Sequence, residues 1–297
     1  MQRADFVGGR FTTAVPLSSG ATAEVYRAYD AHLDRPVALK LLRIDDPDLS
    51  ERLLREARAQ ARVKHPGICD IYAVGSLDGR AFIAMELIEG DDLGTAAADM
   101  TLRETVRIMA EVAEAIEAAH AAGLVHRDLK PANIMVETRA DGARVARVVD
   151  FGLVRDSHGR LGARDLTAHG QWLGTPPFMA PEQARGDRDA EGPASDVYAL
   201  GATLYHLLAG RPPFIRPSDS ETLAAVLREP APPLRRWAPA VPTALARIVH
   251  LCLHKAPDDR YLSAGALAAD LRRFLAGRAP QLRGPGWSGG GRGRARR

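Results

Sequence analysis

The chain has 297 residues, of which 46% are hydrophobic and 26% charged, as is ordinary for a soluble globular protein. No run of about 18 apolar residues occurs and the first five residues lack the apolar core of a signal peptide, so we expect no membrane span and a cytoplasmic location. The formal net charge of +3 is too small to indicate a nucleic-acid partner, and two cysteines without metal-like spacing fit a reducing compartment.

Residues 1–88 are expected to form a small lobe rich in β-strands. The segment 49–63 is dense in Arg, Glu, Leu and Ala and has no Gly or Pro, which predicts one helix in this lobe. Short stretches of alternating or continuous apolar residues predict the strands of its sheet. These are residues 11–15, 24–29, 36–42, 68–74 and 81–87.

Residues 89–277 are expected to form a larger and mostly helical lobe. Thr101 and Glu104 form the pattern of a capping box, in which each side chain satisfies a backbone N–H at the start of a helix. Short strands are predicted at 134–136 and 145–149. Further helices are predicted, between proline-rich loops, at residues 195–209, 220–228, 242–254 and 263–276.

Residues 278–297 have a different composition, rich in Gly and Arg. They contain too little apolar surface to fold, so a disordered tail is expected. Its basic end could bind nucleic acid weakly, but a solvated end is the more frequent outcome for such a segment.

The most informative stretch is His126-Arg127-Asp128-Leu129-Lys130-Pro131-Ala132-Asn133, which is followed, 22 residues after Asp128, by Asp150-Phe151-Gly152. Together these segments supply four groups that phosphoryl transfer from ATP needs. Asp128 can accept the proton of an attacking hydroxyl, and Lys130 can neutralise charge on the moving phosphoryl group. Asn133 and Asp150 can hold Mg²⁺.

These motifs resemble the catalytic core of the Hanks-type protein kinases, in particular the bacterial serine/threonine kinases, over about residues 11–275. The resemblance implies an α+β, bilobal fold with a small antiparallel sheet lobe, one main helix in that lobe and a larger helical lobe. It also implies that ATP and Mg²⁺, or Mn²⁺, bind between the lobes.

Lysine usage supports this resemblance. Of the 40 Lys and Arg residues four are lysine, which leaves 36 arginines. Two of the four, Lys40 and Lys130, fall at the positions where a kinase requires lysine, because arginine is bulkier and cannot act as a compact point charge beside a phosphate.

Val37-Ala38-Leu39-Lys40 matches the strand that presents the phosphate-binding lysine. A buried ammonium needs a carboxylate partner. Glu56, on the predicted helix, is the favoured partner of Lys40. The separation of 16 residues is short for the family, so Glu51 remains the alternative.

The nucleotide-covering loop departs from the family pattern of three glycines. Gly20 keeps the central position, while Ser18 and Ala23 replace the first and third glycines. Glycine suits these positions because the backbone must approach the phosphates closely. We expect weaker or slower nucleotide binding rather than loss of activity.

By resemblance, Met85 to Gly90 is the hinge between the lobes, with Met85 as the gatekeeper. The backbones of Glu86 and Ile88 are expected to bind the adenine edge, and Asp92 to meet the ribose. The adenine ring is expected to lie between four apolar side chains, Leu17, Val25, Ala38 and Met135.

The segment from Asp150 to Glu182 resembles an activation loop, and the placement of Lys130 resembles serine/threonine rather than tyrosine kinases. Thr175 is expected to hydrogen-bond Asp128 and Lys130. Thr167 is the favoured phosphorylation site and Ser157 the second candidate. Arg127 is expected to pair with the phosphate.

Two further matches support the resemblance to protein kinases, and the second, with the Ala180-Pro181-Glu182 segment, disfavours a small-molecule kinase. Asp196 fits the helix residue that braces the backbone of the catalytic loop. Arg260 fits the buried arginine that pairs with Glu182.

The expected function is therefore transfer of the γ-phosphoryl group of ATP to Ser and Thr hydroxyls of proteins, with autophosphorylation in the activation loop, in trans if a homodimer forms. The alternatives are a pseudokinase, favoured by the altered glycine loop alone, and a small-molecule phosphotransferase. The protein substrates and the activating signal are not specified. The chain is expected to be either a free cytosolic kinase or the kinase portion of a longer product.

Overall fold

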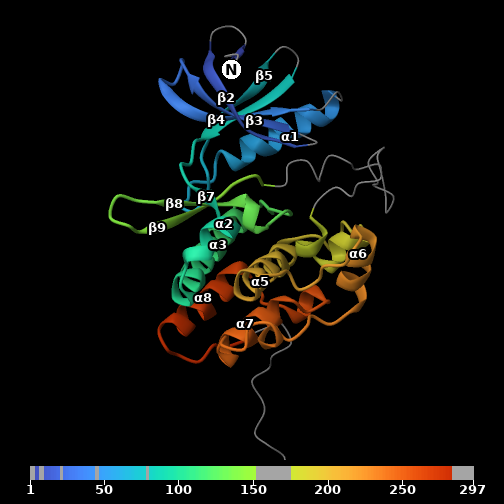
Figure 1. Cartoon of the computed structure of the whole chain (residues 1–297). Helices are drawn as coiled ribbons and strands as arrows, with labels where there is room; N and C mark the ends of the chain where they lie inside the picture. The colour runs from blue at the N-terminus through green and yellow to red at the C-terminus, as the bar shows by residue number, and fades with distance from the viewer. Residues whose placement is uncertain are drawn as a thin grey trace, which may run out of the picture.

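The computed structural model describes residues 4–6, 10–20, 23–43, 47–77, 80–151 and 175–282. A lobe built on a β-sheet lies against a larger helical lobe, and a small three-stranded sheet lies between them (Figure 1). This arrangement confirms the predicted fold class. The division at residue 88 stays a prediction.

The N-terminal lobe is a six-stranded antiparallel sheet in the order β1-β2-β3-β4-β6-β5. One helix, α1 (Pro47–Gln60), packs on β5 and β6. The sequence predicted five of these strands and the helix, and it missed the short β1. The strands are β1 (Ala4–Phe6), β2 (Phe11–Ser19), β3 (Ala23–Asp30), β4 (Arg35–Leu42), β5 (Ile71–Leu77) and β6 (Arg80–Glu86).

The second sheet has the order β7-β8-β9. In the sequence, β7 precedes and β8 follows the His126–Asn133 motif, which we call the catalytic loop. Its strands are β7 (Asp91–Asp92), β8 (Ile134–Thr138) and β9 (Arg144–Val148). The short helix α2 (Leu93–Ala96) follows β7 directly. Because β8 starts at the end of the His126–Asn133 motif and β9 ends just before Asp150, this hairpin brings the two predicted motifs together.

The C-terminal lobe is helical, as predicted. The long helix α3 (Leu102–Ala121) starts at Thr101 with the predicted capping box, in which the Glu104 N–H donates to Thr101 Oγ1 and the Thr101 N–H donates to Glu104 Oε2. The other helices are α4 (Pro181–Arg185), α5 (Pro193–Ala209), α6 (Asp219–Arg228), α7 (Thr243–Cys252) and α8 (Ala264–Leu275).

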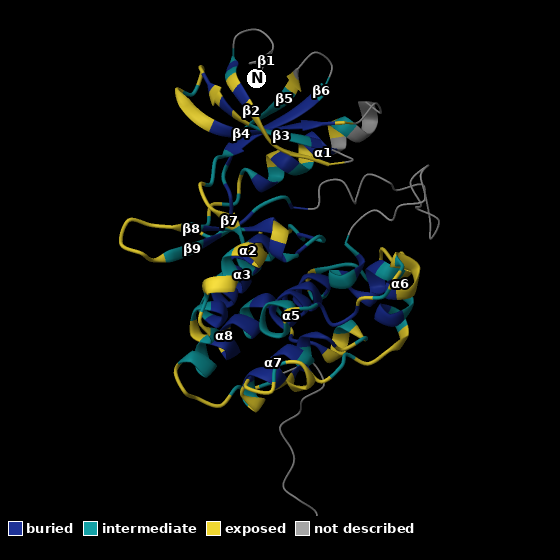
Figure 2. Cartoon of the chain, in the orientation of Figure 1, coloured by how far each residue is buried: buried dark blue, intermediate teal, exposed yellow. Residues whose placement is uncertain are grey.

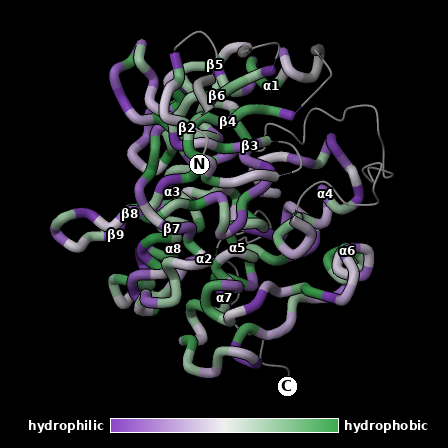
Figure 3. The backbone as a smooth tube through the Cα atoms, turned by 45° about the horizontal axis from the view of Figure 1, so that its top comes forward, coloured by the Kyte–Doolittle hydropathy of each residue, from purple (hydrophilic) through white to green (hydrophobic). Residues whose placement is uncertain are grey.

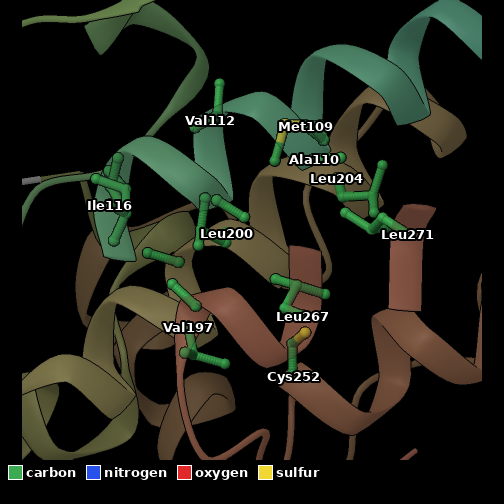
Figure 4. Close-up of a cluster of buried hydrophobic side chains, with 14 of the residues drawn as sticks. Met109, Ala110, Val112, Ile116, Val197, Leu200, Leu204, Cys252, Leu267 and Leu271 are labelled. Atoms are coloured by element: carbon green, nitrogen blue, oxygen red, sulfur yellow. The ribbon is translucent and has the colours of Figure 1, made fainter. Parts of the chain in front are cut away.

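The main hydrophobic core lies where α3, α5, α7 and α8 meet. Apolar side chains of α3, among them Met109 and Ile116, face Leu200 of α5 and Leu267 of α8 in Figure 4. Helix α5 is buried along most of its length (Figure 2). It therefore forms the centre of this lobe, and the residues at its first turn are held rigidly.

Residues 278–282, which the composition assigns to a disordered tail, are instead held against α8. The backbone N–H groups of Gln281 and Leu282 donate to the two carboxylate oxygens of Asp270 at 2.7 and 2.8 Å. Asp270 is buried and also accepts a hydrogen bond from Tyr261. Residues 281 and 282 are therefore attached to the helical lobe, and the prediction for residues 283–297 lies outside the described residues.

Polar and apolar segments alternate along the backbone (Figure 3). Within the residues that the structure describes, no helix combines the length and the apolar character that a membrane span needs.

Helix α5 approaches α7 closely at Gly201, where an added Cβ would lie 2.3 Å from Cβ of Cys252. We expect Gly201→Ala to lower the free energy of unfolding by about 1–3 kcal/mol, because the two helices must move apart. Thermal or urea unfolding measures this change.

Gly192→Ala is the matched control, since an added Cβ at Gly192 meets no atom within 4 Å. An unfolding midpoint for Gly201→Ala equal to that of Gly192→Ala would show that the helices accommodate the methyl group without cost.

Candidate active site

The catalytic loop gathers the side chains that the sequence singled out. Lys130 Nζ donates to Asp128 Oδ2 and to Thr175 Oγ1, each at 2.8 Å. Asn133 Nδ2 donates to the carbonyl oxygen of Asp128 at 2.8 Å and to Asp128 Oδ2 at 3.1 Å. The predicted contact of Thr175 with Lys130 is present, and Thr175 reaches Asp128 through this lysine.

These bonds leave one oxygen of Asp128 for a substrate. Within the described part of the chain, Oδ1 of Asp128 makes no hydrogen bond, whereas Oδ2 accepts two. The side chain is 23% exposed. A small hollow beside it is lined by Arg127, Asp128, Leu129, Thr175, Phe178 and Met179. A substrate hydroxyl that enters this hollow meets a carboxylate that is already oriented.

The catalytic loop is shaped by the buried carboxylate of Asp196, at the first turn of α5. Asp196 Oδ2 accepts the N–H of His126 at 2.7 Å, and Oδ1 accepts the N–H of Arg127 at 2.8 Å. Arg127 has a φ of 66°, in the left-handed region that non-glycine residues rarely adopt. The predicted brace is present. It supplies hydrogen bonds that offset this strain.

His126 contacts the backbone on both sides of the site. Its ring is fully buried. Nε2 lies 3.0 Å from the carbonyl oxygen of Val149, and Nδ1 accepts the N–H of Asp128 at 3.3 Å, which together require the neutral ring protonated at Nε2. Burial also lowers the pKa of His126. The ring therefore fixes the backbone on both sides of the site.

A second buried carboxylate, Glu182, holds the chain that follows Thr175. Arg260 donates to both oxygens of Glu182 at 2.7 Å, and both side chains are fully buried. Ser195 Oγ also donates to Glu182, and Arg260 donates to the carbonyl oxygen of Ala194. The predicted ion pair is present and is fixed to the start of α5.

Across the site, Lys40 Nζ donates to Asp150 Oδ1 at 2.7 Å. Burial by itself raises the pKa of Asp150, but the charge and the hydrogen bond of Lys40 outweigh this effect and hold the pKa below its ordinary value. The carboxylate therefore stays ionised at neutral pH. The predicted pairing of Lys40 with Glu56, and the alternative with Glu51, stay predictions.

The donor set of Asn133 and Asp150 fits Mg²⁺. The amide nitrogen of Asn133 bonds to Asp128, which leaves the amide oxygen to bind a cation, and Asp150 offers an ionised carboxylate. Hard oxygen donors of this kind are those that Mg²⁺ prefers. Among the described residues, no three or more His, Cys, Asp or Glu side chains are grouped so as to hold a metal ion. A site formed by Asn133 and Asp150 would use one carboxylate and one amide oxygen.

Two of the four residues predicted to surround adenine, Val25 and Ala38, lie in one apolar cluster. Ala38 on β4 is paired directly with Met85 on β6, and Val25 on β3 is paired with Lys40. Val25, Ala38, Met85 and Ile88 belong to one apolar cluster, whereas the side chain of Leu17 is exposed. Met135, on β8, is paired with Asp92.

Asp92 has a structural role that the sequence did not predict. Its carboxylate accepts the N–H groups of Gly94 and Thr95 and caps α2. The contacts of Asp92 with ribose, and of the Glu86 and Ile88 backbones with adenine, stay predictions.

The nucleotide-covering loop, between β2 and β3, is held by an arginine that the sequence analysis did not single out. Arg43, just after β4, donates to the carbonyl oxygen of Gly20 at 3.2 Å, to Ser19 Oγ at 3.1 Å and to Glu24 at 2.7 Å. Ala23 is buried on β3, and Ser18 is exposed on β2. Arg43 therefore joins Ser19 and Gly20, at the end of β2, to Glu24 on β3.

Other contacts were also missed by sequence reasoning. His120, at the end of α3, lies 2.8 Å from Asp196 Oδ2, and Gln183 donates to the carbonyl oxygen of Arg127. No local pattern marks these residues. Thr167, Ser157 and Gly152 lie outside the described residues.

The protein kinase domain profile matches residues 11–270. The chain belongs to the protein kinase family. It is 40% identical, over 88% of its length, to the "DNA damage-responsive serine/threonine-protein kinase RqkA" of Deinococcus radiodurans, of which it covers 39%. It is 34% identical, over 92% of its length, to the "Serine/threonine-protein kinase PknA" of Mycobacterium tuberculosis, of which it covers 63%.

The kinase domain of Mycobacterium tuberculosis PknI has a similar fold, with a TM-score of 0.72 and 27% identity over 93% of this chain and 100% of that one. The chain spans less than two thirds of the length of the two curated relatives.

Arg43→Gln removes the charged donors that hold the nucleotide loop of this kinase-family chain. We expect the Kd for MgATP to rise about three- to tenfold, since each lost hydrogen bond contributes about 1 kcal/mol or less at an exposed site. Isothermal titration calorimetry measures this change.

Arg80→Gln is the matched control, because Arg80 contacts the same Glu24 but, among the described residues, bonds to neither Ser19 nor Gly20. Equal effects in both variants would assign the change to the ion pair with Glu24 rather than to the loop.

Proposed function

We propose that this chain transfers the γ-phosphoryl group of ATP to Ser and Thr hydroxyls of proteins. The observation that carries the proposal is the Lys130 ammonium, which bridges Asp128 and Thr175. The three groups come from the catalytic loop and from the far end of the activation segment. They meet beside the small hollow that Asp128, Thr175 and Phe178 help to line.

The contacts of each residue support a proposed role. Asp128 Oδ1 orients the substrate hydroxyl and accepts its proton as the oxygen attacks phosphorus. Lys130 holds Oδ2 of the same carboxylate and lies close to the charge that moves with the phosphoryl group. Thr175 fixes the position of the ammonium. The acceleration comes from fixed charges and positions rather than from a covalent intermediate.

On the nucleotide side, Lys40 is held at Asp150 and is proposed to bind the α- and β-phosphates. Asn133 and Asp150 are proposed to hold Mg²⁺ or Mn²⁺. A bound divalent cation would neutralise negative charge on the phosphate oxygens. Val25, Ala38, Leu17 and Met135 are proposed to enclose adenine.

Asp128→Asn keeps the shape of this side chain but removes its capacity to accept a proton. We expect turnover to fall by at least about 10²-fold, with little change in ATP affinity. Phosphate incorporation from labelled ATP into a generic Ser/Thr protein substrate measures this effect. Near-normal turnover would contradict the role of Asp128, and ATP binding without transfer in the wild type would favour a pseudokinase.

We further propose autophosphorylation of the activation loop, at Thr167 first and at Ser157 second, in trans between two copies. Arg127, beside Asp128, is the expected partner of the phosphate. Mass spectrometry of active enzyme after incubation with MgATP is expected to find phosphate on Thr167, and to find none there in Asp128→Asn. Unmodified Thr167 in active enzyme would contradict this assignment.

A further inference from the structure

A basic and aromatic patch lies on the helical lobe, outside the active site. We define it by Arg211, Arg236 and Trp237. The guanidinium carbon of Arg211 lies 4.4 Å from the centroid of the Trp237 ring, and that of Arg236 lies 5.1 Å from it. Trp237 is 42% exposed. Two cations and one large aromatic ring are therefore presented together at the surface.

The two guanidinium groups lack an acidic partner. Within the described residues, neither Arg211 nor Arg236 makes an ion pair. Arg216, Arg260 and Arg272 of the same lobe each pair with a carboxylate. No acidic residue occurs between Glu229 and Asp258 in the sequence, while Arg235, Arg236 and Arg247 fall in that interval. The patch therefore keeps an uncompensated positive charge.

The floor of the patch is Tyr205 of α5, which is fully buried. Burial raises the pKa of its phenol, and the neighbouring Arg211, Trp237 and Arg236 act in the opposite direction. The hydroxyl makes no hydrogen bond of normal geometry in the described part of the chain. Arg211 and Arg236 thus lie near a buried phenol, and neither forms an ion pair among the described residues.

Each guanidinium group can bind a carboxylate through two parallel hydrogen bonds. The two guanidinium groups also occupy the space over the indole ring, whereas stacking of a nucleic-acid base requires an open aromatic face. The chemistry of the patch therefore favours a segment rich in Asp and Glu over a nucleic acid.

The position of the patch relative to the catalytic loop follows from α5. Asp196, in the first turn of α5, binds the backbone of the catalytic loop, and Arg211 follows the C-terminal end of the same helix at Gly210. Fifteen residues of helix span about 22 Å. An extended peptide needs at least about six or seven residues to cover that distance. This distance sets a lower limit of about six or seven residues on the separation between an acceptor at the catalytic loop and a segment bound at the patch.

We propose that Arg211, Arg236 and Trp237 form a docking site for an acidic segment of protein substrates, at least about six residues away from the phosphorylated Ser or Thr. This inference rests on the proposed kinase function. Docking at the patch raises the local concentration of the acceptor at Asp128, so it lowers KM and leaves kcat unchanged.

The first test measures binding alone. A fluorescein-labelled peptide of four Glu residues flanked by Gly and Ala, without any hydroxyl side chain, is titrated with the full chain and followed by anisotropy. The double variant Arg211→Gln/Arg236→Gln is expected to weaken binding at least about tenfold. Arg228→Gln/Arg247→Gln, which removes two exposed arginines from α6 and α7 of the same lobe, is the charge-matched control and is expected to change binding little.

The second test measures catalysis with Ser peptides that carry the Glu segment two or twelve residues from the acceptor, on either side. The long-spaced peptide is expected to have a KM about tenfold below that of its Gln counterpart, and this difference is expected to vanish in the double variant. Equal unfolding midpoints verify that the variants fold.

Two results would overturn the docking site. One is equal peptide binding by the wild type and the double variant. The other is tighter binding, lost in the double variant, of a labelled single-stranded oligonucleotide of equal charge, which would identify a nucleic acid as the ligand. The anisotropy test needs no phosphoryl transfer. Peptide binding at the patch by a protein without kinase activity would therefore contradict the proposed function but not the binding site for acidic segments.

Discussion

The first turn of α5 is the constraint on which the candidate active site depends. Asp196 binds two backbone N–H groups of the catalytic loop, and Ser195 donates to Glu182, which in turn binds Arg260. Consecutive residues of one helix thus hold Asp128 on one side of the site and the chain after Thr175 on the other. Because α5 is buried within the helical core, neither side can move without disturbing that core.

Burial explains why these carboxylates fix the geometry so strictly. A charged group that loses water must find hydrogen bonds within the protein, and removal of one partner leaves an uncompensated charge. Glu182 accepts two hydrogen bonds from Arg260, and Asp196 is surrounded by N–H donors. Such networks tolerate one arrangement, which is what a reaction that depends on positioning requires.

The nucleotide side depends on a longer-range contact. Lys40 belongs to the sheet lobe and Asp150 follows the small sheet, so their ion pair couples the two lobes across the proposed ATP site. Arg43 adds a second attachment, from the end of the same strand to the loop above that site. Ser18 and Ala23 stand where the family pattern has glycine. In this chain, Arg43 holds Ser19 and Gly20 in place before a nucleotide binds.

The sequence by itself determined the elements and the local chemistry. The capping box of α3, five strands of the large sheet and the cluster of Asp128, Lys130 and Asn133 follow from short spacings, because residues within one loop or one turn of helix cannot separate far. Family resemblance added the pairs Glu182–Arg260 and Thr175–Lys130.

Only the tertiary structure decided the contacts of His120 and Arg43, the approach of Gly201 to Cys252 and the stacking of Arg211 on Trp237. These join segments whose separation in space is set by how whole helices and strands pack, and no local periodicity encodes that packing.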